Sequence, residues 1–129
     1  MKKIEVVAAI VINNKKIFCT QRLNIGEVAL KWEFPGGKID VNESKAQALE
    51  REIKEELDSD ISINEYYTTI EHQYEIFHLT MHCNKYTLIS DKITLKEHLD
   101  YCWLPINKLG TLDWALADWP IIRKLESGR

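Results

Sequence analysis

The chain has 129 residues, with 17 Lys or Arg against 20 Asp or Glu and a formal net charge of −3. This length is enough for one domain, expected to span residues 1–129, that buries a hydrophobic core. The lack of a basic excess argues against a surface for a nucleic-acid polymer. No segment approaches the roughly 18 apolar residues that a membrane-spanning helix needs, so no membrane association is expected.

The cysteines are consistent with a reducing compartment. Cys19, Cys83 and Cys102 are odd in number, widely spaced and without a C-x-x-C motif. This usage is typical of reduced thiols, so a cytoplasmic protein is expected. The opening MKKIEVVAAIVI resembles a secretion signal only loosely, because Glu5 interrupts a short apolar run, and we predict a first strand instead.

Hydrophobic periodicity and turn residues predict the elements in chain order. A β-hairpin is predicted from residues 4–12 and 16–22 around Asn13-Asn14, followed by a short extended piece at 31–34 and a Pro-Gly-Gly turn. After a helix that begins near Lys45, the strand-like segments are 61–63, 66–73, 76–84, 86–89 and 101–104. One helical turn at 107–109 precedes a closing helix at 118–125. Strands on both sides of one helix, with a terminal helix, predict an α/β class: an α/β/α sandwich around a mixed β-sheet.

The most informative segment is GKIDVNESKAQALEREIKEEL, from Gly37 to Leu57. Its Ser44 and Gln47 fit a capping box, which places the start of the helix near Lys45. At about 100° per residue, three carboxylates of this helix share one narrow face. They are Glu52, Glu55 and Glu56. The adjacent stripe is apolar and is predicted to pack on the core. It consists of Ala46, Leu49, Ile53 and Leu57.

Three carboxylates on one face repel each other unless a hard cation neutralises them. Oxygen ligands favour Mg²⁺ or Mn²⁺, which bridge phosphate oxygens and activate water. Arg51 lies four residues before Glu55 and is suited to orient a ligand carboxylate. The alternative is an ordinary solvated helix with ion pairs such as Glu50–Lys54. The glycine turn and Glu43 at this spacing favour the metal site.

These residues resemble a known family. Gly37, Glu43, Arg51-Glu52 and Glu55-Glu56 match the Nudix box, G-x5-E-x7-R-E-U-x-E-E-x-G-U, where U is apolar. The chain departs from the box where Asp58 replaces a glycine and Ser59 an apolar residue. Asp adopts the left-handed conformation at modest cost, so we expect a strained or shifted helix end. Ile61 is expected to supply the missing apolar contact.

Segments outside the box resemble the MutT-like branch, the nucleoside triphosphate pyrophosphohydrolases. They are Thr20-Gln21-Arg22, Trp32-Glu33-Phe34-Pro35-Gly36-Gly37-Lys38 and Ala117-Asp118-Trp119-Pro120-Ile121-Ile122. The opening IEVVAAIV and the segment Glu97-His98…Cys102-Trp103 look similar to bacterial CTP and modified-pyrimidine pyrophosphohydrolases of this branch.

The resemblance implies a Mg²⁺ cofactor, with Mn²⁺ as the alternative, and assigns the residues that hold it. The implied metal ligands are the Gly36 carbonyl and Glu52, Glu55, Glu56 and Glu97. Arg51 and the same glutamates form the implied catalytic group, with Glu97 as ligand or general base. Glu97 is otherwise an ordinary loop acid. Lys38 is expected to meet a phosphate, and its alternative is simple solvent exposure.

Three residues are expected to contact the nucleotide base. Arg22 offers a donor, Phe34 an aromatic face and Asp118 an acceptor for an amino group or ring N–H. A protonated Asp118 would instead donate to a carbonyl, as an oxidised guanine requires, and the sequence leaves its protonation open. The structural alternative for Asp118 is an N-cap before Pro120, and both roles are compatible with one residue.

The resemblance therefore implies hydrolysis of a (deoxy)nucleoside triphosphate to the monophosphate and pyrophosphate. The expected role is the removal of oxidised or modified nucleotides, such as 8-oxo-dGTP or modified dCTP. Two alternatives stay open: a Nudix hydrolase of another diphosphate such as ADP-ribose, and a non-catalytic nucleotide-binding module. The sequence also leaves open whether the chain is a monomer or a homodimer.

Overall fold

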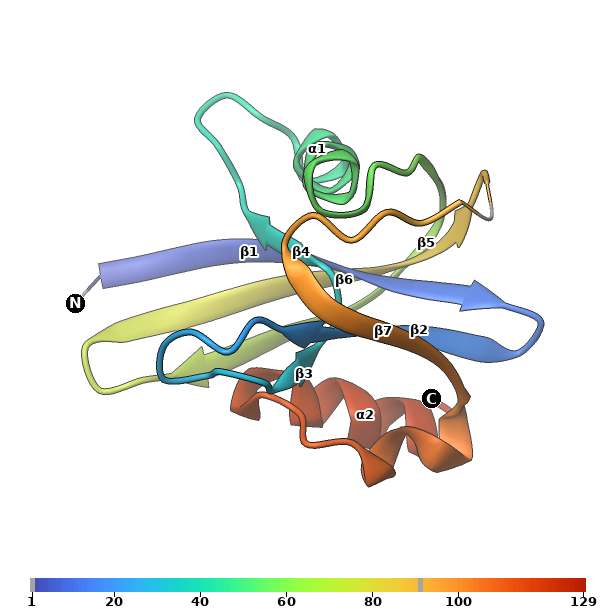
Figure 1. Ribbon diagram of the computed structural model, residues 1–129. Helices are drawn as coiled ribbons and strands as arrows, with labels where there is room; N and C mark the ends of the chain where they lie inside the picture. The colour runs from blue at the N-terminus through green and yellow to red at the C-terminus, as the bar shows by residue number, and fades with distance from the viewer. Residues whose placement is uncertain (1, 91) are drawn as a thin grey trace.

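A computed structural model describes residues 2–90 and 92–129, with the backbone alone at residues 63 and 64. The elements in chain order are β1 Lys2–Asn13, β2 Lys16–Arg22, β3 Trp32–Glu33, β4 Gly36–Lys38, α1 Lys45–Leu57, β5 Ile61–Gln73, β6 Phe77–Leu88, β7 His98–Pro105, the 3₁₀ helices η1 Ile106–Thr111 and η2 Leu116–Asp118, and α2 Trp119–Glu126. Helix α1 lies on one side of the sheet and α2 on the other (Figure 1). The predicted α/β/α sandwich is confirmed.

The sheet is mixed, as predicted, and β1 is its central strand. The strand order is β3-β2-β1-β6-β5, with β4 paired to β1 and β7 paired to β2. Strand β1 runs parallel to β6 and antiparallel to β2 and β4. The predicted hairpin between β1 and β2 is present, and its turn residues Asn14 and Lys15 both have positive φ, at 52° and 64°.

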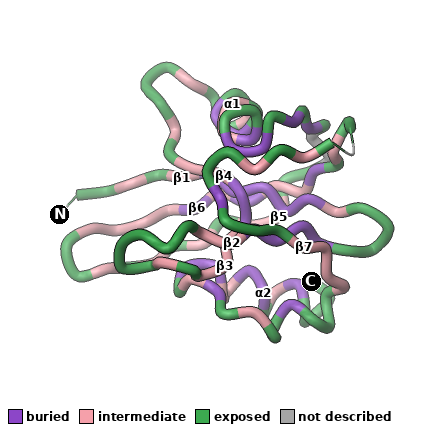
Figure 2. Tube along the Cα trace, viewed as in Figure 1, coloured by how far each residue is buried: buried purple, intermediate pink, exposed green. Residues whose placement is uncertain are grey.

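Alternate residues of β1 point into two hydrophobic layers. Val7, Ala9 and Val11 pack with the buried face of α1. Ala8 and Ile10 pack on the other side, in the cluster that contains α2. Every residue from 7 to 11 is therefore buried, as expected for a strand covered on both faces. Figure 2 shows this burial along the middle of the sheet.

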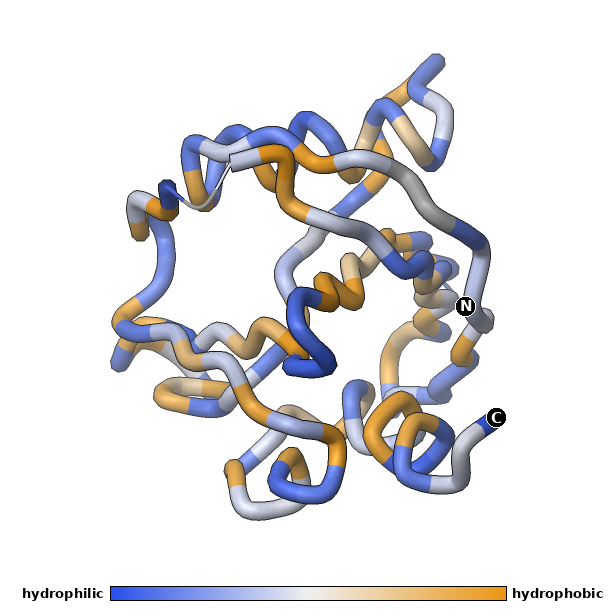
Figure 3. The backbone as a smooth tube through the Cα atoms, turned by 90° about the vertical axis from the view of Figure 1, so that its right-hand side faces the viewer, coloured by the Kyte–Doolittle hydropathy of each residue, from blue (hydrophilic) through white to orange (hydrophobic). Residues whose placement is uncertain are grey.

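Helix α2 is amphipathic and closes the second layer. Ile121, Ile122 and Leu125 are buried, whereas Arg123 is exposed. Figure 3 shows hydrophobic and hydrophilic residues alternating around this helix near the C-terminus. None of the helices in residues 2–90 and 92–129 is long and apolar enough to cross a membrane.

Both ends of α1 follow the local sequence. The Ser44 side chain accepts a hydrogen bond from the Gln47 N–H, and the predicted capping box is present. The helix ends at Leu57, and Asp58 has φ 51° and ψ 41°, so the left-handed conformation is confirmed. Ser59 is buried with its hydroxyl 2.6 Å from the Lys92 carbonyl oxygen. Ile61 joins the buried cluster that contains Leu57, as expected.

Several boundaries differ from the prediction. The segments 61–63 and 66–73 form one strand, β5, because register shifts after Ile63 and after Tyr66 absorb the residues that broke the pattern. The segments 76–84 and 86–89 likewise form one strand, β6. The segment 36–38, predicted as part of a turn, pairs with β1 as strand β4. In α1, Ala48 is buried and Ala46 only half-buried, so that part of the predicted stripe was wrong.

Candidate active site

The glycine pair of β4 lets the backbone pass close to both β1 and α1. Gly36 has φ 154°, and a Cβ there would overlap the carbonyl oxygen of Val7. A Cβ on Gly37 would lie 2.5 Å from the carboxyl carbon of Glu52. The glycines therefore allow the Glu52 carboxylate to sit against the backbone of β4.

Arg51 joins the loop before α1 to the acidic face of the helix. Its Nε and Nη2 donate to the two carboxylate oxygens of Glu43 at 2.7 and 2.9 Å, and Nη2 also donates to the Lys38 carbonyl at 3.0 Å. Its Nη1 donates to Glu52 at 3.0 Å and to Glu55 at 3.2 Å. The hydrogen bond from Arg51, with one from the Asp40 N–H, lowers the pKa of Glu43 to about 2.

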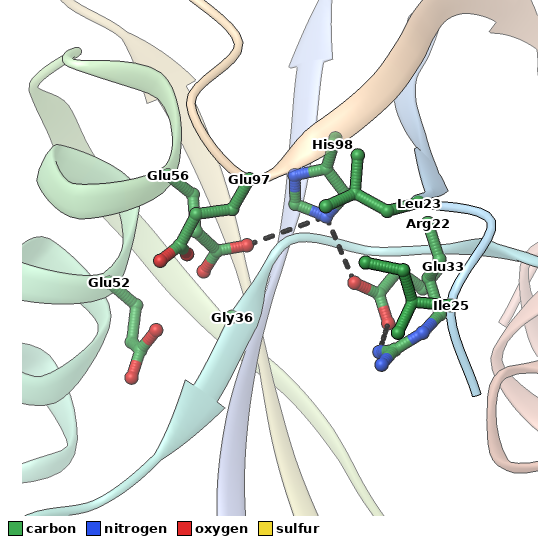
Figure 4. A pocket seen from close by; sticks show the side chains of 9 residues that line it. All are labelled: Arg22, Leu23, Ile25, Glu33, Gly36, Glu52, Glu56, Glu97 and His98. Atoms are coloured by element: carbon green, nitrogen blue, oxygen red, sulfur yellow. Dashed lines mark hydrogen bonds and ion pairs between the residues drawn. The ribbon is translucent and has the colours of Figure 1, made fainter. Parts of the chain in front are cut away.

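An acidic pocket of about 360 Å³ opens beside this face of α1 (Figure 4). Its polar residues come from three parts of the fold: α1, the ends of the short strands β3 and β4, and the place where β2 ends and β7 begins. The lining residues are Arg22, Leu23, Ile25, Glu33, Gly36, Glu52, Glu56, Glu97 and His98.

Glu56 is the most deeply placed carboxylate of the acidic pocket. Its side chain is only 4% exposed, and within the described residues its Oε2 has no hydrogen-bond partner. Burial, reinforced by the charges of Glu33, Glu52 and Glu97, raises the pKa of Glu56 to about 10. A buried carboxylate without compensation is costly, and a cation relieves that cost. The residues present therefore fit a divalent cation held through carboxylate oxygens.

Glu33, unlike Glu56, has a lowered pKa and hydrogen-bond partners for both carboxylate oxygens. Its Oε1 accepts from Arg22 at 2.8 Å and its Oε2 lies 2.9 Å from His98 Nε2. Burial opposes ionisation of Glu33, but the hydrogen bonds from His98 and Arg22 outweigh it and lower the pKa. The ligand atoms of Glu33, Glu56 and His98 all lie within 4.8 Å of one another, a grouping that could also hold a metal ion.

A second pocket of about 280 Å³ adjoins the acidic pocket and is more apolar. Asp118 lies in its lining, is buried, and accepts a hydrogen bond from the Phe34 N–H at 3.3 Å. Burial, with the charge of Glu33, raises the pKa of Asp118 well above its ordinary value. Asp118 occupies the N-cap position of α2 but makes no side-chain capping bond, so the capping role was wrong. Phe34 also lines this pocket, but the residue is only 4% exposed, and its ring stacks on Trp114 with centroids 4.8 Å apart.

The structure thus gathers most of the predicted site residues and leaves three outside. Gly36, Glu52, Glu56 and Glu97 share the acidic pocket, Arg22 lines both pockets, and Phe34 and Asp118 line the second. The other three, which line neither of the two pockets, are Lys38, Arg51 and Glu55. Glu55 has a side chain 53% exposed, and the Lys38 residue is exposed on β4.

Two residues of the acidic pocket were missed by the sequence reasoning: Glu33 and His98. Both stood in segments that carried the family resemblance, next to the predicted Phe34 and Glu97. Glu33 and His98 are 65 residues apart, and nothing in the sequence indicates that they are in contact. The one available signal was residue type, since a carboxylate and an imidazole next to predicted site residues are suited to a catalytic or metal site.

Comparison with known proteins agrees with this geometry. The family model described as NUDIX domain matches residues 6–124. The chain is 36% identical over 124 residues to the CTP pyrophosphohydrolase of Escherichia coli (strain K12), covering 95% of this chain and 90% of that protein. It is 31% identical over 127 residues to the 8-oxo-dGTP diphosphatase of the same strain, covering 98% of each.

Solved structures show the same fold. A solution structure of the DNA mismatch repair protein MutT (family Nudix hydrolase) from methicillin-resistant Staphylococcus aureus 252 has a TM-score of 0.78 and 41% identity, and the match covers 100% of both chains. The crystal structure of the MutT protein from Methanosarcina mazei Go1 has a TM-score of 0.86 at 21% identity, covering 98% of this chain and 95% of that one. Because the family model matches nearly the whole chain and the E. coli relatives align over almost their full lengths, this chain belongs to the Nudix family and is a Nudix hydrolase.

Proposed function

We propose that this hydrolase cleaves a (deoxy)nucleoside triphosphate into the monophosphate and pyrophosphate, with Mg²⁺ as the cofactor and Mn²⁺ as a substitute. The observation that carries the proposal is the junction of the two pockets, which share Arg22, Glu33 and Gly36. One pocket is acidic and suits a metal with its phosphates, and the other is apolar with one buried carboxyl group and suits a base. A nucleoside triphosphate needs both.

In this proposal the acidic pocket holds the metal and the phosphate chain. Glu52 and Glu56 are the central ligands, and the Gly36 carbonyl, Glu55 and Glu97 complete the set. A cation held by these residues would neutralise phosphate charge and lower the pKa of an attacking water. Arg51 fixes the orientation of Glu52 and Glu55 through its Nη1.

The remaining steps fall to side chains around this centre. Glu97, exposed at the mouth of the acidic pocket, is suited to accept the proton of the water. Lys38, exposed on β4 next to Gly37, is assigned to a phosphate oxygen. Holding water and phosphate in line supplies much of the rate enhancement.

The second pocket is assigned to the base, with Asp118 as the reading group and Arg22 as a further donor. The raised pKa of Asp118 favours its neutral form, which donates a hydrogen bond to a base carbonyl. An oxidised guanine such as 8-oxo-dGTP offers carbonyl oxygens to such a donor and is our first candidate, and a modified dCTP is the second. Because the Phe34 ring stacks on Trp114, Phe34 can contact a base only at the edge of the second pocket. We further propose that one domain of 129 residues, acting in the cytoplasm, carries the whole activity.

A substrate panel tests this assignment. The compounds are 8-oxo-dGTP, dGTP, CTP, dCTP, 5-methyl-dCTP and ADP-ribose, compared by kcat/KM with Mg²⁺. We expect the triphosphates to release pyrophosphate, with 8-oxo-dGTP preferred. Rapid ADP-ribose cleavage with inert triphosphates would replace the proposal with the diphosphate alternative. Tight nucleotide binding without turnover would instead indicate a non-catalytic module.

A further inference from the structure

His98 lies at the first residue of β7 and reaches into the acidic pocket because of a β-bulge. Gln21 of β2 pairs with Asp100, but Arg22 pairs with His98, so Leu99 is the extra residue. A regular register would pair Arg22 with Leu99 and place His98 on the opposite face. Bulges re-aim side chains in this way, and here the result is an imidazole only 3% exposed between two glutamates.

The His98 Nε2 faces two carboxylates. It lies 2.9 Å from Glu33 Oε2 and 3.6 Å from Glu56 Oε1, as the dashed lines of Figure 4 show. The lowered pKa of Glu33 keeps it ionised and able only to accept, so the His98 Nε2 carries a proton and its N–H donates a hydrogen bond to Glu33. Glu33 is held in turn by Arg22 at 2.8 Å. Arg22, Glu33 and His98 therefore form a fixed chain that ends against Glu56.

Among the residues that the structure describes, His98 is the one basic side chain within 4 Å of the Glu56 carboxylate. It faces Oε1, while Oε2 is buried without a hydrogen-bond partner. One oxygen of Glu56 is thus approached by an N–H, and the other stays available to a ligand. At 3.6 Å this contact is longer than a hydrogen bond, so the packed imidazole and its N–H dipole restrict Oε1 without sharing the proton. Side chains around metal-binding carboxylates commonly fix the orientation of those carboxylates.

We propose that His98 is a positioning residue that fixes the Glu56 carboxylate for metal binding, and that Glu33 and Arg22 anchor it. This inference rests on the proposed role of Glu56 as a metal ligand. A direct ligand role for His98 is disfavoured because its Nε2 proton is committed to Glu33, and because the Arg22 guanidinium occupies the other Glu33 oxygen. A cation bound there would lie beside a permanent positive charge.

The test measures Mn²⁺ affinity by electron paramagnetic resonance, independently of turnover. We expect His98→Ala to weaken Mn²⁺ binding about 10- to 100-fold. His98→Gln should recover part of the affinity, because the glutamine amide N–H can donate to Glu33. The matched control is His78→Gln. The His78 Nε2 also lies beside a carboxylate, 3.2 Å from Glu71 Oε1, but His78 is outside the acidic pocket.

Two results would overturn the inference. The first is wild-type Mn²⁺ affinity in His98→Ala while Glu56→Gln binds weakly. The second is electron spin-echo coupling from an imidazole nitrogen to bound Mn²⁺ in the wild type, which would make His98 a ligand. Undiminished Mn²⁺ affinity in Glu56→Gln would overturn the proposed metal site itself and the inference with it. If thermal unfolding shows that His98→Ala is not folded, His98→Gln is compared with wild type instead. We then expect His98→Gln to bind Mn²⁺ more weakly than wild type. Equal kcat and equal Mn²⁺ affinity in the two proteins would contradict the inference.

Discussion

The carboxylate of Glu52 lies directly over Gly37, where a Cβ would come within 2.5 Å of its carboxyl carbon. The same carboxylate is held by Arg51 at 3.0 Å, so it is fixed from two sides. The glycine of the Nudix box is thus explained by contact, since Gly36 has a positive φ and Gly37 does not. Its absent side chain leaves the space that a proposed metal ligand occupies.

Replacing Gly37 tests this contact. Gly37→Ala should push Glu52 away from β4 and lower kcat/KM about 100-fold, the cost of a displacement near 1 Å in an active site. The control is Gly110→Ala, where the new Cβ would lie 3.6 Å from Glu126 in ordinary contact. The measurement is kcat/KM with thermal unfolding of both variants. Full activity in folded Gly37→Ala would show that the position of Glu52 does not matter.

The Arg51–Glu43 pair predicts a dependence of stability on pH. Arg51 and the Asp40 N–H lower the pKa of Glu43 to about 2 in the folded protein, against about 4.3 in an unfolded chain. The unfolded state binds the proton first, so this contribution is present above about pH 4.3 and lost as pH falls towards 2. Thermal unfolding between pH 6 and 2 should show a smaller loss of Tm for Glu43→Gln than for wild type. Parallel curves would contradict the prediction.

Asp118 should control base preference without affecting the metal. Asp118→Ala removes the carboxyl group that would bond to the base, and leaving a buried polar group of the base without that partner costs about 1–3 kcal/mol, or roughly 5- to 150-fold. We expect the kcat/KM ratio of 8-oxo-dGTP to dGTP to change by a factor in this range, with Mn²⁺ affinity unchanged. Asp118→Asn, which keeps a donor and an acceptor, should lie between Asp118→Ala and wild type. An unchanged ratio in Asp118→Ala would remove Asp118 from base recognition.

The left-handed end of α1 predicts a stabilising substitution. Asp58 has φ 51° and ψ 41°, a conformation that glycine adopts without the penalty of about 1–2 kcal/mol borne by side chains. Asp58→Gly should raise the free energy of unfolding by about 1 kcal/mol in urea and leave kcat/KM unchanged, since Asp58 lines neither pocket. Asp60→Gly, two residues later and without positive φ, should lower stability instead. A loss of stability in Asp58→Gly would show that the Asp58–Lys54 ion pair, at 3.5 Å, contributes more than the relief of the left-handed backbone penalty.

The sequence predicted what depends on local spacing. The start of α1 at Lys45 followed from the capping box of Ser44 and Gln47, and the shared face of Glu52 and Glu56 from helical periodicity. The left-handed Asp58 followed from its place in the box. Each of these needs only residues within one or two helical turns.

The missed features depend on pairing between distant segments. Strand β4 forms because Gly36 and Gly37 fit against β1, which the sequence alone presents as a turn. His98 enters the acidic pocket through a bulge at Leu99, and neither Glu33 nor Arg22 is near it in sequence. The Phe34 ring stacks on Trp114, 80 residues away, so its expected free aromatic face is largely used in packing.

Glu56 is proposed to belong to a metal site that drives triphosphate cleavage. The most direct measurement is Mg²⁺-dependent pyrophosphate release from 8-oxo-dGTP and 5-methyl-dCTP by wild type and Glu56→Gln. We expect one pyrophosphate for each monophosphate in wild type, with loss of turnover in a folded Glu56→Gln variant. Full activity of Glu56→Gln, or no pyrophosphate from either substrate with wild type, would contradict the account.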